Sequence, residues 1–107
     1  MMRRVIKKID FLDLSTGLKI EINSAIPLCP GRKVLVQTQR AKDLKFYIML
    51  EVIEQRQENY IGKVLGPEGY HGDRDLIYPG KYLKFEFDGM TLDDEVWFEK
   101  KNAANVF

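Results

Sequence analysis

Residues 44–65 read LKFYIMLEVIEQRQENYIGKVL, two largely apolar runs separated by a polar segment. Because the first run, 44–53, is apolar at nearly every position, its periodicity does not separate a strand from a buried helix. We favour a strand, since aromatic and β-branched residues are plentiful and no clear cap precedes the run. Residues 54–58 then form the turn of a hairpin whose second strand is 60–65. Coverage of both faces predicts a central position for the first strand in a closed or nearly closed sheet.

Around this hairpin, apolar and polar residues alternate with a period of two, which is typical of strands that bury one face. In one segment Leu18, Ile20 and Ile22 share the apolar face, and in another Val96 and Phe98 do so. Similar patterns recur before and after the hairpin. The segments predicted as strands beside the hairpin are 5–12, 18–23, 33–39, 82–88 and 95–99.

Six or seven short strands at intervals of about a dozen residues predict a mainly β fold, either a barrel or a sandwich. We favour a small antiparallel β-barrel that takes up residues 1–107 as a single domain, because closure removes exposed sheet edges. Two longer loops are expected at 23–32 and 66–80. The end of the chain, 101–107, is expected to form a short helical turn whose last two residues, Val106 and Phe107, pack on the barrel.

Length and composition narrow the class of protein further. The chain has 107 residues, enough for one hydrophobic core, and its 45% hydrophobic and 31% charged residues are typical of a folded protein. The longest apolar run, 46–50, is far shorter than the roughly 20 residues of a membrane helix, so we expect no membrane insertion. No secretory signal is recognisable, which predicts a cytoplasmic location. Cys29 is the single cysteine, which leaves no intramolecular disulfide, and we expect it to be buried.

Charge is unevenly distributed along the chain, although the net charge is only +1. Residues 1–50 hold ten Lys or Arg against four Asp or Glu, a balance of +6, and residues 51–107 hold seven against twelve, a balance of −5. The basic excess is either solvated at the surface, which is the commoner case, or an anion site. The residues that make up this excess are mainly Arg3, Arg4, Lys7, Lys8, Arg32, Lys33, Arg40, Lys42 and Lys45.

Residues able to carry catalysis are sparse. His71 and Cys29 fall in different long loops, with no spacing that supports a nucleophilic pair. Asp73 and Asp75 lie near His71, but a metal site needs three or four converging ligands and one loop supplies all of these. No glycine-rich phosphate loop occurs. We therefore expect no enzyme, no bound metal and no cofactor.

Nucleic acid is not expected as a partner either. A small β-barrel can stack bases on exposed aromatic residues, for which Tyr47, Tyr60, Tyr82 and Trp97 are candidates. Binding of a polyanion, however, demands a basic stripe along the groove. This chain is nearly neutral and offers only a local basic patch.

Residues 13–20, DLSTGLKI, and residues 27–34, PLCPGRKV, resemble two segments of the PilZ domain family, and residues 46–65 resemble the hairpin that follows them there. The resemblance spans about residues 3–66 and leaves residues 81–107 unmatched. It implies a six-stranded β-barrel that binds the bacterial second messenger cyclic di-GMP and relays the signal to a partner protein.

The PilZ family binds its ligand with an R-x-x-x-R motif and a D/N-x-S-x-x-G motif. Arginine suits this ligand because its planar guanidinium stacks on guanine and forms forked hydrogen bonds to base edges and phosphates. Here Lys7 and Lys8 stand four residues after the two arginines, and the glycine comes one position before that of the motif. The ligand-binding residues that the resemblance implies are Arg3, Arg4, Asp13, Ser15 and Gly17.

Residues 13–17 also fit a simple turn between strands 5–12 and 18–23, since Asp, Ser, Thr and Gly are common turn formers. Two functions therefore remain open. One is a small non-enzymatic regulatory module that is PilZ-like and binds cyclic di-GMP. The alternative is a β-barrel module that binds no small ligand and contacts a protein through an edge strand or an apolar patch. In the alternative, Trp97 or the 106–107 end would be exposed.

Overall fold

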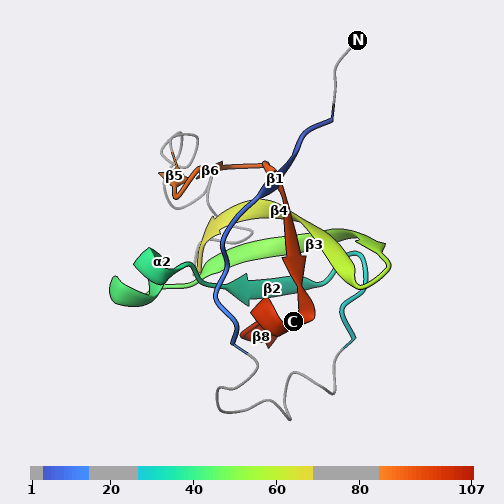
Figure 1. Ribbon diagram of the computed structural model, residues 1–107, viewed down its shortest axis with the longest axis horizontal. Helices are drawn as coiled ribbons and strands as arrows, with labels where there is room; N and C mark the ends of the chain where they lie inside the picture. Colours follow the sequence, from blue (N-terminus) through green and yellow to red (C-terminus); the bar gives the residue numbers. More distant parts are fainter. Residues whose placement is uncertain (1–3, 15–26, 69–84) are drawn as a thin grey trace.

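The computed structural model describes residues 4–14, 27–68 and 85–107 (Figure 1). The predicted mainly β fold is confirmed. In chain order the elements are β1 (Ile6–Lys8), β2 (Lys33–Val36), the helix α2 (Gln39–Asp43), β3 (Ile48–Arg56), β4 (Asn59–Pro67), β5 (Glu86–Phe87), β6 (Met90–Thr91), β7 (Glu95–Glu99), the 3-10 helix η2 (Lys100–Asn102) and β8 (Asn105–Val106).

Strands β3 and β4 form the predicted hairpin, so the choice of strand over helix is confirmed from Ile48 onwards. β4 is longer than expected at both ends, whereas β3 begins four residues later and ends three residues later than the predicted strand. Only Gln57 and Glu58 therefore remain for the turn, and Gln57 adopts a left-handed φ of 57°. Ile48, Met49 and Leu50 are all 0% exposed although successive side chains point to opposite faces. Both faces of β3 are therefore covered, as its sequence predicts.

The six-stranded sheet has the order β1-β7-β4-β3-β2-β8, and β5 and β6 form a separate two-stranded sheet. Its ladders are antiparallel except the one between β1 and β7, where Ile6 lies opposite Glu95 and Lys8 opposite Trp97 in parallel. The predicted antiparallel arrangement therefore holds for the other ladders of this sheet and is wrong at this edge. Parallel neighbours need a long connection, and here most of the chain separates them.

The described strands do not close the sheet by pairing, since no ladder joins the end strands β1 and β8 among these residues. Residues 9–14 cross the opening instead (Figure 1). The N–H of Leu12 donates to the carbonyl of Gln37 at 2.8 Å, and the N–H of Leu14 donates to that of Lys101 at 2.7 Å. Single backbone hydrogen bonds therefore connect the two sides of the opening, where a closed barrel would have a continuous ladder between strands.

The core is packed tightly around Gly62, in the middle of β4. A Cβ added at Gly62 would lie 3.1 Å from Cβ of Leu50 and 3.1 Å from Cε1 of Phe98. Phe98 is 2% exposed and Val96 is 0% exposed, which confirms the apolar face predicted for residues 95–99. The glycine is thus required by the close approach of its two neighbours.

The strand predicted at 33–39 ends early, at Val36, and helix α2 follows it. Thr38 is the N-cap of this helix: its backbone is extended and its hydroxyl oxygen accepts the N–H of Ala41 at 3.2 Å. Thr38 also donates its hydroxyl proton to the carboxylate of Asp88. A side chain that satisfies an otherwise unpaired helical N–H thus outweighs the strand propensity of the segment.

The strand predicted at 5–12 is reduced to three residues. Val5 is 64% exposed and does not share a buried side with Phe11, which is 8% exposed. The prediction is wrong here because the chain leaves the edge of β7 after Lys8 and crosses towards β2.

The C-terminal prediction is correct in part. A helical turn forms at η2, slightly earlier than expected, and β8 then pairs with β2, with Val106 opposite Val34. Val106 is 3% exposed and packs in the core, as predicted. Phe107 is 49% exposed, so the expectation that it docks is wrong.

Cys29 is exposed, which corrects the expectation that it is buried. The neighbouring Leu28 is the residue that enters the core. The chain then turns at Gly31, whose φ is 96°, and the N–H of Arg32 donates to the carbonyl of Cys29 at 3.1 Å.

Several predictions fall outside the described residues, and the structure does not test them. These are the strand at 18–23, the beginning of the strand at 82–88, the loop at 66–80 beyond residue 68, and the region around His71.

Candidate functional site

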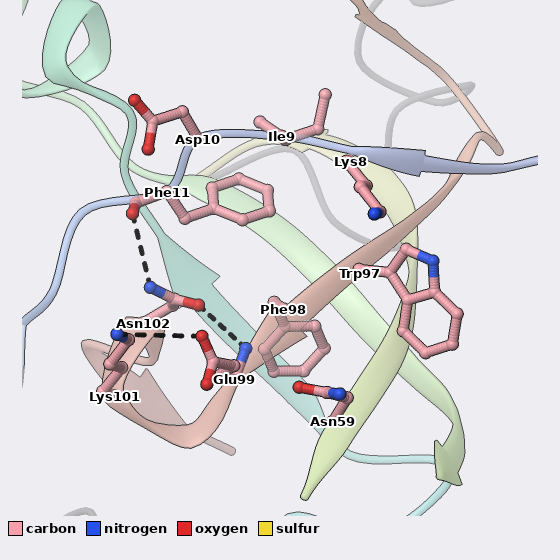
Figure 2. Close-up of a pocket in the computed structure, with 10 residues that line it drawn as sticks. All are labelled: Lys8, Ile9, Asp10, Phe11, Asn59, Trp97, Phe98, Glu99, Lys101 and Asn102. Atoms are coloured by element: carbon pink, nitrogen blue, oxygen red, sulfur yellow. Dashed lines mark hydrogen bonds and ion pairs between the residues drawn. The ribbon is translucent and has the colours of Figure 1, made fainter.

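A groove opens where β1 and β7 diverge. The two strands pair only as far as Lys8 and Trp97, and residues 9–11 then leave the edge of β7. The space between them has a volume of about 570 Å³, which falls within the range of about 300–1,000 Å³ for ligand sites. Figure 2 shows the residues that line it, which are 8–11, Asn59, 97–99 and 101–102.

The side chain of Asn102 holds two walls of the groove together. Its Oδ1 accepts the N–H of Glu99 at 2.8 Å, and its Nδ2 donates to the carbonyl of Phe11 at 3.4 Å (Figure 2). The same Nδ2 also donates to the carbonyl of Leu12 at 3.0 Å. Asn102 is only 6% exposed. A buried amide with these partners fixes the crossing segment relative to the end of β7.

Trp97 forms another wall of the groove. The guanidinium of Arg56 lies 5.7 Å from the centre of the indole and donates to the carboxylate of Glu54. One face of the indole is therefore occupied by a cation, which stabilises its position. The remainder of the half-buried ring stands beside the groove (Figure 2).

The basic residues of the first strand segment differ in their partners. Arg4 pairs with Glu54 at 3.0 Å and with Glu95, and Lys7 pairs with Asp94 at 2.7 Å. Lys8 has no ion-pair or hydrogen-bond partner for its ammonium group within the part of the chain that the structure describes. In Figure 2 its side chain extends from β1 into the groove.

Two of the carboxylates that hold β1 have lowered pKa values. Hydrogen bonds from Arg56, and then from Arg4, hold the pKa of Glu54 below its ordinary value. Partial burial disfavours the ionised form of Asp94, but hydrogen bonds from Lys7 and from Thr91 outweigh it and lower the pKa of Asp94. Both groups are thus charged at neutral pH, and β1 is held to the sheet edge by ion pairs as well as by its short ladder.

Acid should weaken the attachment of β1 through Asp94. Because the folded state lowers the pKa of this carboxyl, its stabilising effect is present above the ordinary pKa of about 3.9 and is lost progressively as the pH falls below that value. The side chain is 23% exposed, so we expect a loss of about 1 kcal/mol. Thermal melts between pH 7 and pH 3 measure this, and Asp94→Asn should show a smaller dependence on pH than the native chain.

Asp43→Asn is the matched control for this measurement, because Asp43 is exposed and, within residues 4–14, 27–68 and 85–107, its side chain accepts a hydrogen bond only from Gln39, at 3.2 Å. It should keep the native pH dependence. Equal pH profiles for the Asp94 and Asp43 variants would contradict the role assigned to Asp94.

The structure does not bring together the two described residues of the site that the PilZ resemblance implies. Arg4 contacts Glu95 at the start of β7, whereas Asp13 precedes Leu14, which bonds to Lys101 beyond the end of β7. The length of β7, about 15 Å, lies between these contacts. The remaining three residues of that site, Arg3, Ser15 and Gly17, lie outside the described residues.

Sequence reasoning found only part of the groove. The basic excess includes Lys8, and Trp97 is one of the candidate exposed aromatic residues. No sequence pattern indicates a binding role for Asn59 or Asn102. The two asparagines come close to Trp97 and Phe11 only through strand pairing and a contact between distant parts of the chain. Spacing along the sequence holds no signal for such a cluster.

A second hollow lies beside the same segment, 8–10, and is lined by α2 and by Asp88. Its polar residues on α2, at the N-cap Thr38 and at Asp88 have structural partners. Arg40 lies 5.0 Å from the ring centre of Phe87, and Thr38 donates to Asp88. These contacts join α2 to the turn between β5 and β6, so we assign this hollow no ligand.

No protein-family model, curated protein or solved structure matches this chain. Over residues 4–14, 27–68 and 85–107, the structure holds no group of three or more His, Cys, Asp or Glu arranged to bind a metal ion. None of the helices in these ranges is long and apolar enough to cross a membrane. Functional inference therefore starts from the groove.

Proposed function

We propose that this chain is a small binding module, without catalytic activity, that recognises an extended segment of a partner protein in the groove between β1 and β7. The observation that carries the proposal is the convergence of Lys8, Asn59 and Trp97 on this groove, since none of their side-chain polar groups has a hydrogen-bond partner among the described residues. Unsatisfied donors beside an aromatic ring in a concave site favour a ligand that satisfies them.

A protein partner is favoured by the surroundings of the groove. Phe98 and Glu99 of β7 lie beyond the last residue pair with β1 and line the groove. A strand edge that has lost its partner strand can accept an extended segment through backbone hydrogen bonds. Trp97 is half-buried, and tryptophan is enriched where proteins bind one another. Phe107 is 49% exposed. It adds apolar surface of the kind expected for a module that binds no small ligand and contacts a protein.

Selection from a phage-displayed library of random peptides on the immobilised chain tests this function. We expect clones whose binding is lost with Trp97→Ala and kept with Leu44→Ala, which removes an exposed apolar side chain outside the groove. If no clones emerge above background, or if the two variants bind every clone equally, the groove is not a peptide site.

The second candidate is a PilZ-like module that binds cyclic di-GMP. What supports it is the surface position of Asp13 and the partial exposure of Arg4, whose side chain is 42% exposed although it is paired with two carboxylates. Calorimetric titration with cyclic di-GMP decides between the candidates. Micromolar binding that is lost with Arg4→Ala and with Asp13→Ala would favour the nucleotide module, whereas no heat at millimolar ligand would remove it.

A further inference from the structure

Four charged residues line the groove, namely Lys8, Asp10, Glu99 and Lys101, and Lys8 is the basic one without an ion-pair partner among the described residues. The other basic groups nearby are occupied: Arg56 binds Glu54, and Lys101 lies 3.8 Å from Glu99. The pairing of Lys101 also reduces the negative charge that Glu99 presents to the groove. Figure 2 shows the carboxylate of Asp10 directed away from the groove, on the far side of the crossing segment. A local positive charge therefore remains at one wall.

The unpartnered groups around Lys8 are mainly hydrogen-bond donors. Its ammonium has three N–H groups, the amide of Asn59 has two and the indole of Trp97 has one, against a single amide oxygen as acceptor. A ligand that satisfies them must be rich in acceptors and negatively charged. Carboxylate oxygens meet both needs.

A carboxylate fits this set better than a phosphate. Forked recognition of phosphate depends on guanidinium groups. Two described arginines near this edge of the sheet, Arg4 and Arg56, both bind Glu54. A single ammonium matches the single charge of one carboxylate.

Resting on the proposed function, the geometry points to an acidic segment as the ligand. The carboxylate of an Asp or Glu in the partner would bind Nζ of Lys8. The apolar residue next to it would pack against the indole of Trp97. This assigns Lys8 as the residue that selects for the acidic side chain.

The peptides recovered by the library selection provide the probe. Each is resynthesised in two forms, one with its Asp and Glu residues and one with Asn and Gln in their place. On the native chain we expect the acidic form to bind about tenfold more tightly, because a hydrogen bond to a charged group is worth more than a neutral one. With Lys8→Gln the ratio of the two dissociation constants should fall to near one. Lys8 is exposed, so this variant should keep the native melting temperature.

Lys42→Gln is the control, since Lys42 is also exposed and lies outside the groove; it should keep the tenfold ratio. Trp97-dependent peptides that bind equally as acid and amide would overturn the acidic specificity and leave the proposed function standing. The same holds if Lys8→Gln and Lys42→Gln give the same ratio. The absence of any Trp97-dependent peptide would overturn the proposed function itself.

Discussion

Leu50→Ala should lower the free energy of unfolding by about 2–5 kcal/mol. Leu50 lies in the central strand, is 0% exposed and belongs to the main core cluster. Its Cδ1 would be 3.1 Å from a Cβ built on Gly62, so its side chain fills the space above a residue that has none. A glycine backbone cannot extend into the cavity left by the substitution. Urea unfolding followed by the fluorescence of Trp97, the single tryptophan, measures the change.

The exposed Leu44 provides a matched control, because the same atoms are removed at a site that is 57% exposed. Leu44→Ala should change the free energy of unfolding by less than about 0.5 kcal/mol. Similar losses in the free energy of unfolding at the two positions would mean that burial of Leu50 in the central strand does not stabilise the core.

A double-mutant cycle with Gly62 sharpens this prediction. Gly62→Ala alone places a methyl group 3.1 Å from atoms of Leu50 and Phe98, which should cost about 1–3 kcal/mol. In the Leu50→Ala background part of that contact is absent, so the same glycine substitution should cost less. Additive effects would show that the two residues do not contact each other.

The hairpin could be predicted from sequence because the information for it is local. The run at 44–53 and its partner at 60–65 are separated by only a few polar residues, and strand composition favoured this structure over a helix. Helix α2 could also have been predicted from neighbouring residues, because Thr38 is a favourable N-cap residue and accepts the N–H of Ala41 where the end of a strand was predicted. The turn between β5 and β6 has a local signal as well: Asp88-Gly89 is a two-residue turn with φ angles of 49° and 85°.

What the sequence could not supply is the pairing of distant segments. The parallel ladder between β1 and β7 joins the two ends of the chain, and alternation in either strand is compatible with many neighbours. The nucleotide site that the PilZ resemblance implies requires Arg4 and Asp13 to lie close together, which also depends on how distant segments pair. The structure instead gives Arg4 two carboxylate partners. It also places Lys8, one strand position further on than Lys7, at the groove.

Asn102→Ala should lower the free energy of unfolding by about 2–3 kcal/mol, because it leaves buried backbone groups without partners. The affected groups are the N–H of Glu99 and the carbonyls of Phe11 and Leu12. Peptide binding in the groove should weaken as well, since the crossing segment loses its attachment to the end of β7. Asn105→Ala is the control: among the described residues its Oδ1 accepts only the N–H of the adjacent Val106, and the loss should stay below about 1 kcal/mol.

Asn102→Asp separates the acceptor role of this side chain from its donor role. The aspartate keeps an oxygen for the N–H of Glu99 but sets a negative charge against the carbonyls of Phe11 and Leu12. Burial and this repulsion raise the pKa of the new carboxyl in the folded state, so the variant is least stable above the unfolded value of about 3.9. Below the raised pKa of the folded state the carboxyl is protonated and can donate a hydrogen bond again. The deficit relative to the native chain in urea unfolding should therefore shrink between pH 7 and pH 4, and a deficit that is constant with pH would show that the donated hydrogen bonds do not hold the groove together.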